Sequence, residues 1–198
     1  LAGSLARHED LIALYQEMAD KRDPSDLAGI ADLLSRAARE SMAHLADRKA
    51  AIAAWRRVLD LDASNPDTGA PAADALESLY LEVNDMAGLV HVLRTRAGWP
   101  AEAEVRGRLL LRVADLQENR LEQLDAAVET YRGLLDGEGE PVMRAFENLD
   151  RIYQKAKQPR ERVELLKRWL DHLEVNARRT MRFLIAGVAE KELSDLDE

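Results

Sequence analysis

Apolar residues recur at intervals of three and four along almost the whole chain. Leu149, Ile152 and Tyr153 show this spacing in one segment, and Val163 and Leu166 show it in the next. The period places apolar side chains on one face of an α-helix. No run alternates with a period of two, so the pattern predicts no strand. We expect about ten helices, over residues 9–20, 25–43, 47–61, 72–83, 86–97, 101–118, 123–136, 142–156, 160–173 and 175–193.

Proline and glycine mark the expected connections between these helices. The chain has six prolines, and the periodicity places each of them between two helical segments. Proline is tolerated in the first turn of a helix and breaks a helix interior, so these residues separate successive helices. The longest expected connection runs from Asp62 to Pro71 and contains Asn65-Pro66 and a glycine. We expect a mobile loop there, with Asn65 as a candidate helix cap.

The helical pattern repeats along the chain. The segment over 50–60, AAIAAWRRVLD, returns over 126–136 as AAVETYRGLLD. A second kind of helix pair repeats at a slightly shorter interval, which aligns Tyr80 with Tyr153. A unit of about 75 residues and four helices, present in roughly two and a half copies, indicates stacked helical units. Because the chain starts and stops within a unit, we expect one repeat domain over 1–198 that is a fragment of a longer protein.

Small and large residues alternate in this repeat at characteristic positions. Leu34-x-x-Ala37-Ala38 precedes Ala51-x-x-x-Trp55 in the first copy. The same pattern returns in the next copy at Leu110, Val113, Ala114, Ala127 and Tyr131. These residues resemble the tetratricopeptide repeat family over nearly the whole chain. The resemblance implies a right-handed α-solenoid of antiparallel helix pairs, in which the first helix of each pair lines a concave groove that holds peptides or partner proteins.

The resemblance also assigns the residues of a binding face. Its groove positions carry side chains of both charge signs, and they suit either a partner surface or ordinary solvated positions. They are Asp32, Ser35, Arg39, Glu77, Arg108, Leu111, Asp115, Asp150 and Gln154. Trp99, just before Pro100, is a further candidate, either for binding or for packing against the helix that follows it.

Composition narrows the class of partner. The net charge of −9 opposes broad binding to nucleic acid, which requires a basic surface. No apolar run approaches the roughly 18–20 residues needed to span a bilayer, so we expect no membrane insertion. The chain has no cysteine, which excludes disulfides and thiolate metal sites and favours the cytoplasm while allowing the periplasm. The abundance of arginine and alanine is typical of a GC-rich bacterial source.

Candidate chemistry is sparse. The four histidines are His8, His44, His91 and His172, and we interpret them as scattered surface residues outside any helical metal motif. No phosphate-binding loop or nucleophile motif is found. We therefore expect no enzyme, no cofactor and no metal site.

The expected function is that of a protein–protein interaction scaffold or adaptor, which binds a peptide or partner protein through the solenoid surface. The alternative is a regulatory or sensor repeat segment of a larger enzyme or signalling protein. The helix over 175–193 carries the apolar stripe Met181, Leu184, Ile185, Val188 and Ala189 without a following helix to cover it. Open ends of repeat arrays associate, so we expect a homodimer through this C-terminal helix.

Overall fold

The computed structural model describes residues 2–193, and this range contains ten α-helices and no strand. The all-α class predicted from the hydrophobic period is thereby confirmed. The first helix begins well before the expected residue 9, and a π-helical turn, Ser41–Leu45, follows the second. The helices are α1 (Ala2–Asp20), α2 (Leu27–Glu40), α3 (Arg48–Leu61), α4 (Pro66–Glu82), α5 (Met86–Gly98), α6 (Ala103–Asn119), α7 (Leu124–Leu134), α8 (Glu140–Lys155), α9 (Pro159–Trp169) and α10 (Val175–Val188).

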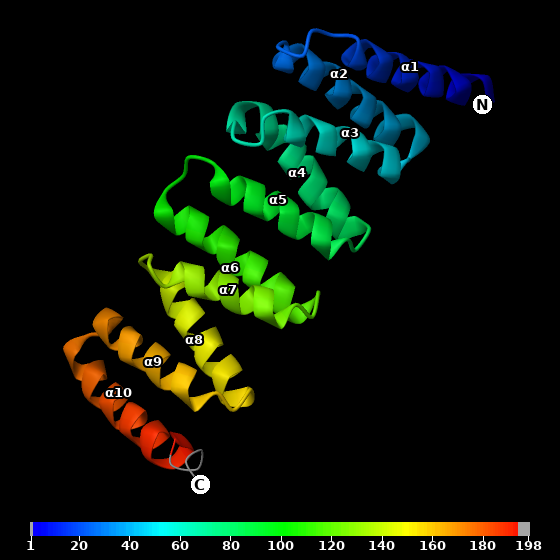
Figure 1. Cartoon of the computed structure of the whole chain (residues 1–198). Coiled ribbons are helices and arrows are strands. Elements are labelled where there is room, and N and C mark those ends of the chain that lie inside the picture. Colours follow the sequence, from blue (N-terminus) through cyan, green and yellow to red (C-terminus); the bar gives the residue numbers. More distant parts are fainter. Residues whose placement is uncertain (1, 194–198) are drawn as a thin grey trace. The chain divides into compact units, whose positions relative to one another are not determined.

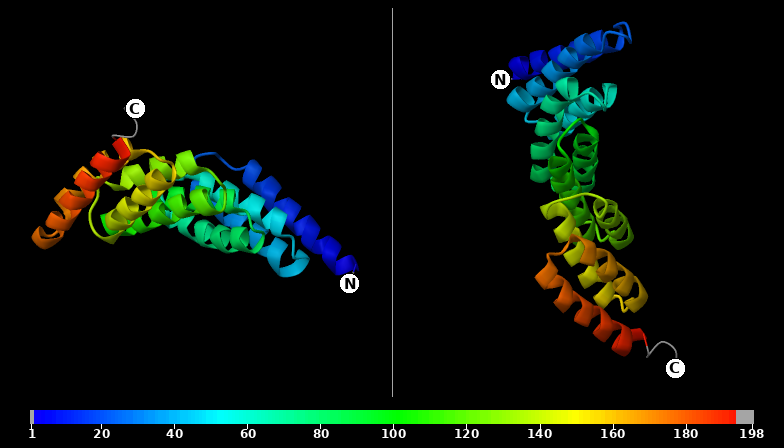
Figure 2. Two further views of the ribbon diagram at one scale, coloured as in Figure 1. Left: turned by 90° about the horizontal axis from the view of Figure 1, so that it is seen from below. Right: turned by 90° about the vertical axis from the view of Figure 1, so that its left-hand side faces the viewer.

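The chain forms two compact units, one ending at Ala101 and the other beginning at Glu102. The first unit contains α1 to α5 and the second contains α6 to α10, in the order seen in Figure 1. Within each unit, helices adjacent in sequence pack side by side, as the further views in Figure 2 also show. In addition, α2 contacts α4 in the first unit and α6 contacts α8 in the second. Alternate helices therefore meet on one face of each unit.

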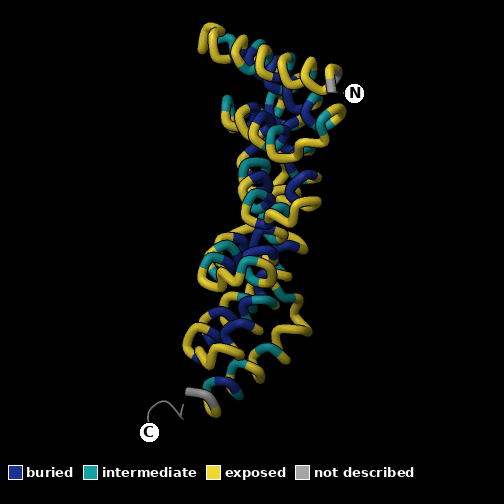
Figure 3. Tube along the Cα trace, turned by 90° about the vertical axis from the view of Figure 1, so that its right-hand side faces the viewer, coloured by how far each residue is buried: buried dark blue, intermediate teal, exposed yellow. Residues whose placement is uncertain are grey.

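The core of each unit lies between its helices, and Figure 3 shows buried and exposed stretches alternating along each helix. Ala38 and Ala114, which are aligned in the repeat, are completely buried and allow the neighbouring helices to approach closely. Trp55 and Tyr131, the aligned large residues, are both buried as well. The repeat therefore places small and large core residues at matching positions of the two units.

The backbone carries the same period as the sequence. The alignment that places Trp55 on Tyr131 also places Ala46 on Glu122. Both of these residues adopt a positive φ, of 50° and 55°. The alignment that places Tyr80 on Tyr153 likewise places Asn84 on Lys157. These two residues also adopt a positive φ, of 55° and 53°. After each of these four positions, the next amide donates to a carbonyl five or six positions earlier, which closes the end of the preceding helix. The same helix ending therefore recurs wherever the side-chain pattern recurs.

The expected loop from Asp62 to Pro71 is wrong over most of its length, because α4 begins at Pro66. Asn65 caps this helix, since its side-chain oxygen accepts a hydrogen bond from the amide of Asp67 at 3.0 Å. Pro66 occupies the first turn, where its missing N–H costs nothing. Pro71 lies inside the helix, where it forfeits the single hydrogen bond to the Asp67 carbonyl.

The apolar stripe of α10 is only partly open. Val188 is buried against Val163 and Leu166 of α9, and Met181, Ile185 and Ala189 pack on the same cluster. Leu184 stays exposed, and Phe183 beside it is 68% exposed. The stripe therefore packs largely on the preceding helix α9, a contact that the prediction of a missing following helix did not anticipate. The homodimer through this helix stays a prediction.

Candidate functional site

A hollow of about 380 Å³ lies on the face that α6 and α8 share in the second unit. Three of the predicted groove residues line it, all from α6. The complete lining is Arg108, Leu111, Arg112, Asp115, Tyr131, Arg144 and Asn148. The structure thus brings Arg108, Leu111 and Asp115 together, as the helical spacing of three and four residues requires.

The hollow exists because α6 and α8 approach closely at one end. Gly107 lies immediately before Arg108 and is buried. A Cβ atom built on Gly107 would lie 2.9 Å from Cβ of Pro141, in the first turn of α8. A larger residue at position 107 would therefore push the two helices apart. The glycine therefore permits the close approach of α6 and α8 beside Arg108.

Three arginines and one aspartate line this hollow. Arg108 pairs with Glu104 at 3.5 Å and Arg144 pairs with Glu140 at 3.3 Å, each one turn along its own helix. Both arginine side chains are 59% exposed. Exposed ion pairs contribute little to stability, so these guanidinium groups can exchange a helical partner for a ligand carboxylate at low cost.

The inner wall of the hollow is an aromatic side chain held by a charged pair. Tyr131 is buried, and its hydroxyl donates to Oε2 of Glu118 at 3.3 Å. Arg151 binds the other oxygen of Glu118 at 2.7 Å. Burial raises the pKa of the Tyr131 hydroxyl, and the carboxylates of Glu118 and Asp115 raise it further. The Tyr131 hydroxyl is therefore uncharged at neutral pH, and its buried ring lies beneath the hollow.

The other two predicted residues of the second unit lie outside this lining. Asp150 of α8 binds Nε of Arg162 at 2.7 Å, and Arg162 is a buried residue of α9. Asp150 therefore joins α8 to α9. Gln154 is exposed one turn further along α8.

In the first unit, the predicted residues of α2 have local partners. Asp32 pairs with Arg36 at 2.9 Å, one turn along the same helix. Ser35 is half-buried. The guanidinium of Arg39 lies over the ring of Trp55 at 5.8 Å from its centroid. Cation–π contacts of this kind fix the direction of an exposed arginine, so Arg39 is oriented by α3.

Two further predicted residues belong to the packing of α4. Glu77 binds Arg96 of α5 at 3.1 Å. Trp99 is only 7% exposed, and its indole nitrogen donates to the carbonyl of Ala63 at 2.8 Å. Its ring lies so close to Gly69 of α4 that a Cβ there would be 2.9 Å away. The surface-binding interpretation of Trp99 is therefore wrong, because the ring is buried against the preceding helix α4.

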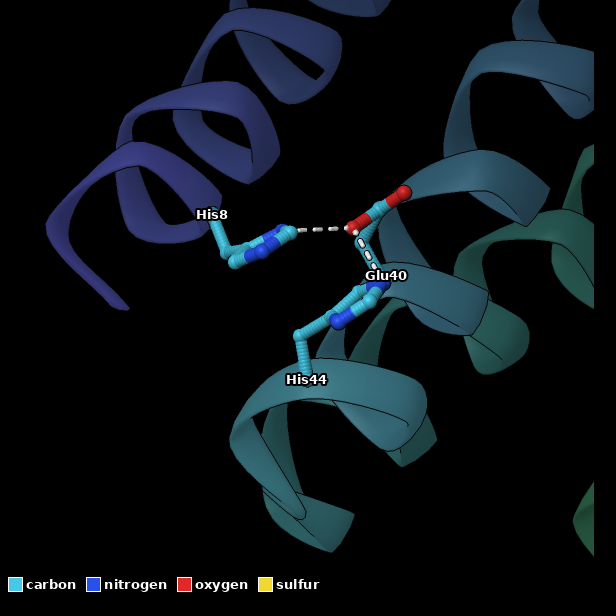
Figure 4. Close-up of side chains that lie close together, drawn as sticks. All are labelled: His8, Glu40 and His44. Carbon is cyan, nitrogen blue, oxygen red and sulfur yellow. Dashed lines mark hydrogen bonds and ion pairs between the residues drawn. The ribbon is translucent and has the colours of Figure 1, made fainter. Parts of the chain in front are cut away.

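A second cluster lies in the first unit, and sequence reasoning missed it. His8 of α1, Glu40 at the end of α2 and His44 in the π-helical turn converge on one point, as Figure 4 shows. Nδ1 of His8 is 3.0 Å from Oε2 of Glu40, and Nε2 of His44 is 3.5 Å from the same oxygen. The two imidazole rings stack with centroids 3.8 Å apart and planes at 9°. The interpretation of these two histidines as scattered residues is therefore wrong.

The available signal for this cluster was the Glu40-x-x-x-His44 spacing, which puts both residues on one helical face. His8 joins them only because α1 packs on α2 and on the π-helical turn, a contact that no sequence spacing displays.

Comparisons with known proteins give no relative. No family model matches the chain, and neither a curated protein nor a solved structure is significantly similar to it. Among the described helices, none is both long and apolar enough to cross a membrane.

Proposed function

We propose that this chain is a protein-interaction scaffold that binds an acidic segment of a partner protein in the hollow between α6 and α8. The architecture we propose for it is a right-handed solenoid of antiparallel helix pairs, as the resemblance to tetratricopeptide repeats implies. The binding face is then the surface formed by the first helix of each pair. The observation that carries the proposal is the hollow of about 380 Å³, because three predicted groove residues line it.

The chemistry of the lining supports a particular kind of ligand. Arg108 and Arg144 offer planar guanidinium groups, which suit the two oxygens of a carboxylate. Leu111, which is half-buried, offers apolar contact between them. A short segment with two or more acidic side chains around one large apolar side chain satisfies both features. Arginine is also one of the residue types that contribute most at protein interfaces.

The experiment is a selection of random peptides displayed on phage against the immobilised protein. We expect the enriched peptides to contain acidic residues flanking a large apolar one. Reversal of two charges in the variant Arg108→Glu/Arg144→Glu should weaken their affinity at least about tenfold, because the attraction becomes repulsion. Fluorescence anisotropy with a labelled peptide measures the change.

The matched control is Arg48→Glu, which reverses an arginine of similar exposure that pairs with Glu82 in the first unit. It should leave peptide affinity unchanged. All three charge reversals should leave the thermal midpoint nearly unchanged, since exposed ion pairs contribute little to folding. Enrichment of basic peptides, or equal affinity for the wild type and the double variant, would refute the proposal.

A further inference from the structure

We infer that His8, Glu40 and His44 form a binding site for a divalent first-row transition metal ion of the Zn²⁺ type. This site lies in the first unit and is independent of the proposed groove. Two imidazole nitrogens and one carboxylate oxygen are a ligand set that Zn²⁺ and its neighbours favour. Three protein ligands leave at least one coordination position for water.

The spacing of the ligand atoms matches such an ion. The candidate donor atoms of the three residues all lie within 4.8 Å of one another. A tetrahedral ion with bonds of about 2.0–2.1 Å holds neighbouring ligand atoms about 3.3–3.4 Å apart. The two distances from Oε2 of Glu40, 3.0 Å to His8 and 3.5 Å to His44, fall on either side of that value. Oε2 of Glu40 is therefore already spaced from both ring nitrogens about as the ligands of one ion are.

The main movement that binding requires is a rotation of an imidazole. The lone pair of a ring nitrogen lies in the plane of the ring, and the two rings are stacked nearly parallel. Parallel rings direct their lone pairs along parallel planes, so one ring must turn before both can meet a common ion. The His44 side chain is 45% exposed and has room to turn. Glu40 and His8 are less exposed, at 26% and 28%, and keep their positions.

Two features of the backbone bring the ligands together, namely the helical spacing of Glu40 and His44 and the packing of α1 on α2. Glu40 and His44 are one helical turn apart across the junction between α2 and the π-helical turn. Ala46 ends this turn with a left-handed φ of 50°, and the amide of Asp47 donates to the carbonyl of Ser41 at 3.0 Å. His8 arrives from α1, so the ion would join α1 to the end of α2.

A ligand that binds only the folded protein stabilises it by mass action. Because the ion would connect α1 to α2, its binding should stabilise the packing of the first helix of the unit. Zinc binding should therefore raise the thermal midpoint of the first unit and slow amide exchange in α1.

The test is calorimetric titration of the whole chain with Zn²⁺ at neutral to mildly alkaline pH, where imidazole is free to bind metal. We expect one ion per chain. The variants His8→Ala, Glu40→Gln and His44→Ala should each weaken binding at least about a hundredfold, since each removes a direct ligand. Co²⁺ provides a second readout, because its visible absorption reports a four-coordinate site with nitrogen and oxygen ligands.

The matched control is His91→Ala, which removes an exposed histidine that lies 3.8 Å from a carboxylate oxygen of Asp60. This variant should bind Zn²⁺ as the wild type does. Circular dichroism without metal should give the same helix content for every variant, because the three ligands lie at the surface. Loss of binding in His91→Ala to the same extent, or a wild type that binds Zn²⁺ no more tightly than His8→Ala, would overturn the inference.

Discussion

The turn between α4 and α5 and the turn between α8 and α9 have the same backbone and different side chains. Asn84 and Lys157, at positive φ, are aligned in the repeat, and the residue after each closes the preceding helix. In the first turn, Oδ1 of Asp85 accepts from the amide of Gly88 at 2.8 Å and caps α5. In the second turn, the aligned Gln158 makes no such side-chain bond to α9 within the described chain.

The difference extends to the two units as a whole. Side chains cap α2, α3, α4 and α5 in the first unit, through Asp26, Asp47, Asn65 and Asp85. Over the described part of the second unit, none of the helices α6 to α10 has a side-chain cap at its start. A cap contributes about 1 kcal/mol to helix stability. Over the described residues, both units therefore keep the apolar positions of the repeat, but only the first unit has side chains that cap the starts of its helices.

The aligned tyrosines show the same divergence. Among residues 2–193, the hydroxyl of Tyr80 is buried without a hydrogen-bond partner, and burial raises its pKa. Its ring lies directly against Gly88, where any Cβ would overlap it. The hydroxyl of Tyr153 instead accepts a hydrogen bond from Nε of Arg132 at 2.8 Å. One tyrosine is thus held by close packing on glycine and the other by a charged donor.

The largest effect should come from filling the space at Gly88. Gly88→Ala should reduce the free energy of unfolding by about 1–3 kcal/mol, because the new methyl group overlaps the Tyr80 ring. Alanine normally stabilises a helix relative to glycine by up to about 1 kcal/mol. Gly98→Ala in the same helix, where a Cβ would meet nothing within 4 Å, is the control and should not destabilise. Urea denaturation followed by circular dichroism measures both, and equal effects would contradict the close packing.

Changes to the helix caps should have an intermediate effect on stability. Removing a cap should destabilise the first unit, and adding one should stabilise the second. Asp85→Ala should cost about 1 kcal/mol, because the first-turn amide of α5 loses its acceptor. Gln158→Asp should stabilise the second unit by about 0.5–1 kcal/mol, because it introduces the missing acceptor at the aligned position. Asp85→Asn is the control, since asparagine caps as well as aspartate does. Thermal unfolding of the three variants decides the matter, and no gain from Gln158→Asp would show that the two turns differ in more than the cap.

The tyrosine hydroxyls should give the smallest effect. Tyr153→Phe should cost about 0.5 kcal/mol, the lower end of the range for a hydrogen bond, because Arg132 is half-exposed and can turn to water. Tyr80→Phe should leave stability unchanged or raise it slightly, because it removes a buried hydroxyl that pairs with no described residue. The same denaturation experiment compares the two. A larger loss from Tyr80→Phe would reveal a hydrogen bond to that hydroxyl.

Periodicity predicted the helices well, because each helix buries one apolar face and the spacing of that face is visible in the sequence. It failed at Pro71, since the periodic residues there are small and a proline signal dominates. Trp99 was misjudged for a similar reason, because its partners belong to a distant part of the chain. They are Gly69 of α4 and the carbonyl of Ala63, in the connection before that helix. Local spacing does not display such contacts.

The candidate sites show the same limit. Arg108, Leu111 and Asp115 share a helical face, so their common hollow follows from spacing alone. Arg144 comes from another helix, and only packing reveals it. His8 is far from Glu40 in the sequence, and its place in the histidine cluster depends on how α1 lies on α2.

In both units, every contact between described α-helices joins neighbours in the chain, apart from the pairs α2 with α4 and α6 with α8. Short separations of this kind give a low contact order, so little loop entropy is lost before the first contacts form. Each helix also depends mainly on the helix before and the helix after it. Opening can therefore begin at one helix and spread to the next. Amide hydrogen exchange should consequently vary by degrees along each unit, with the greatest protection in the helices that have neighbours on both sides.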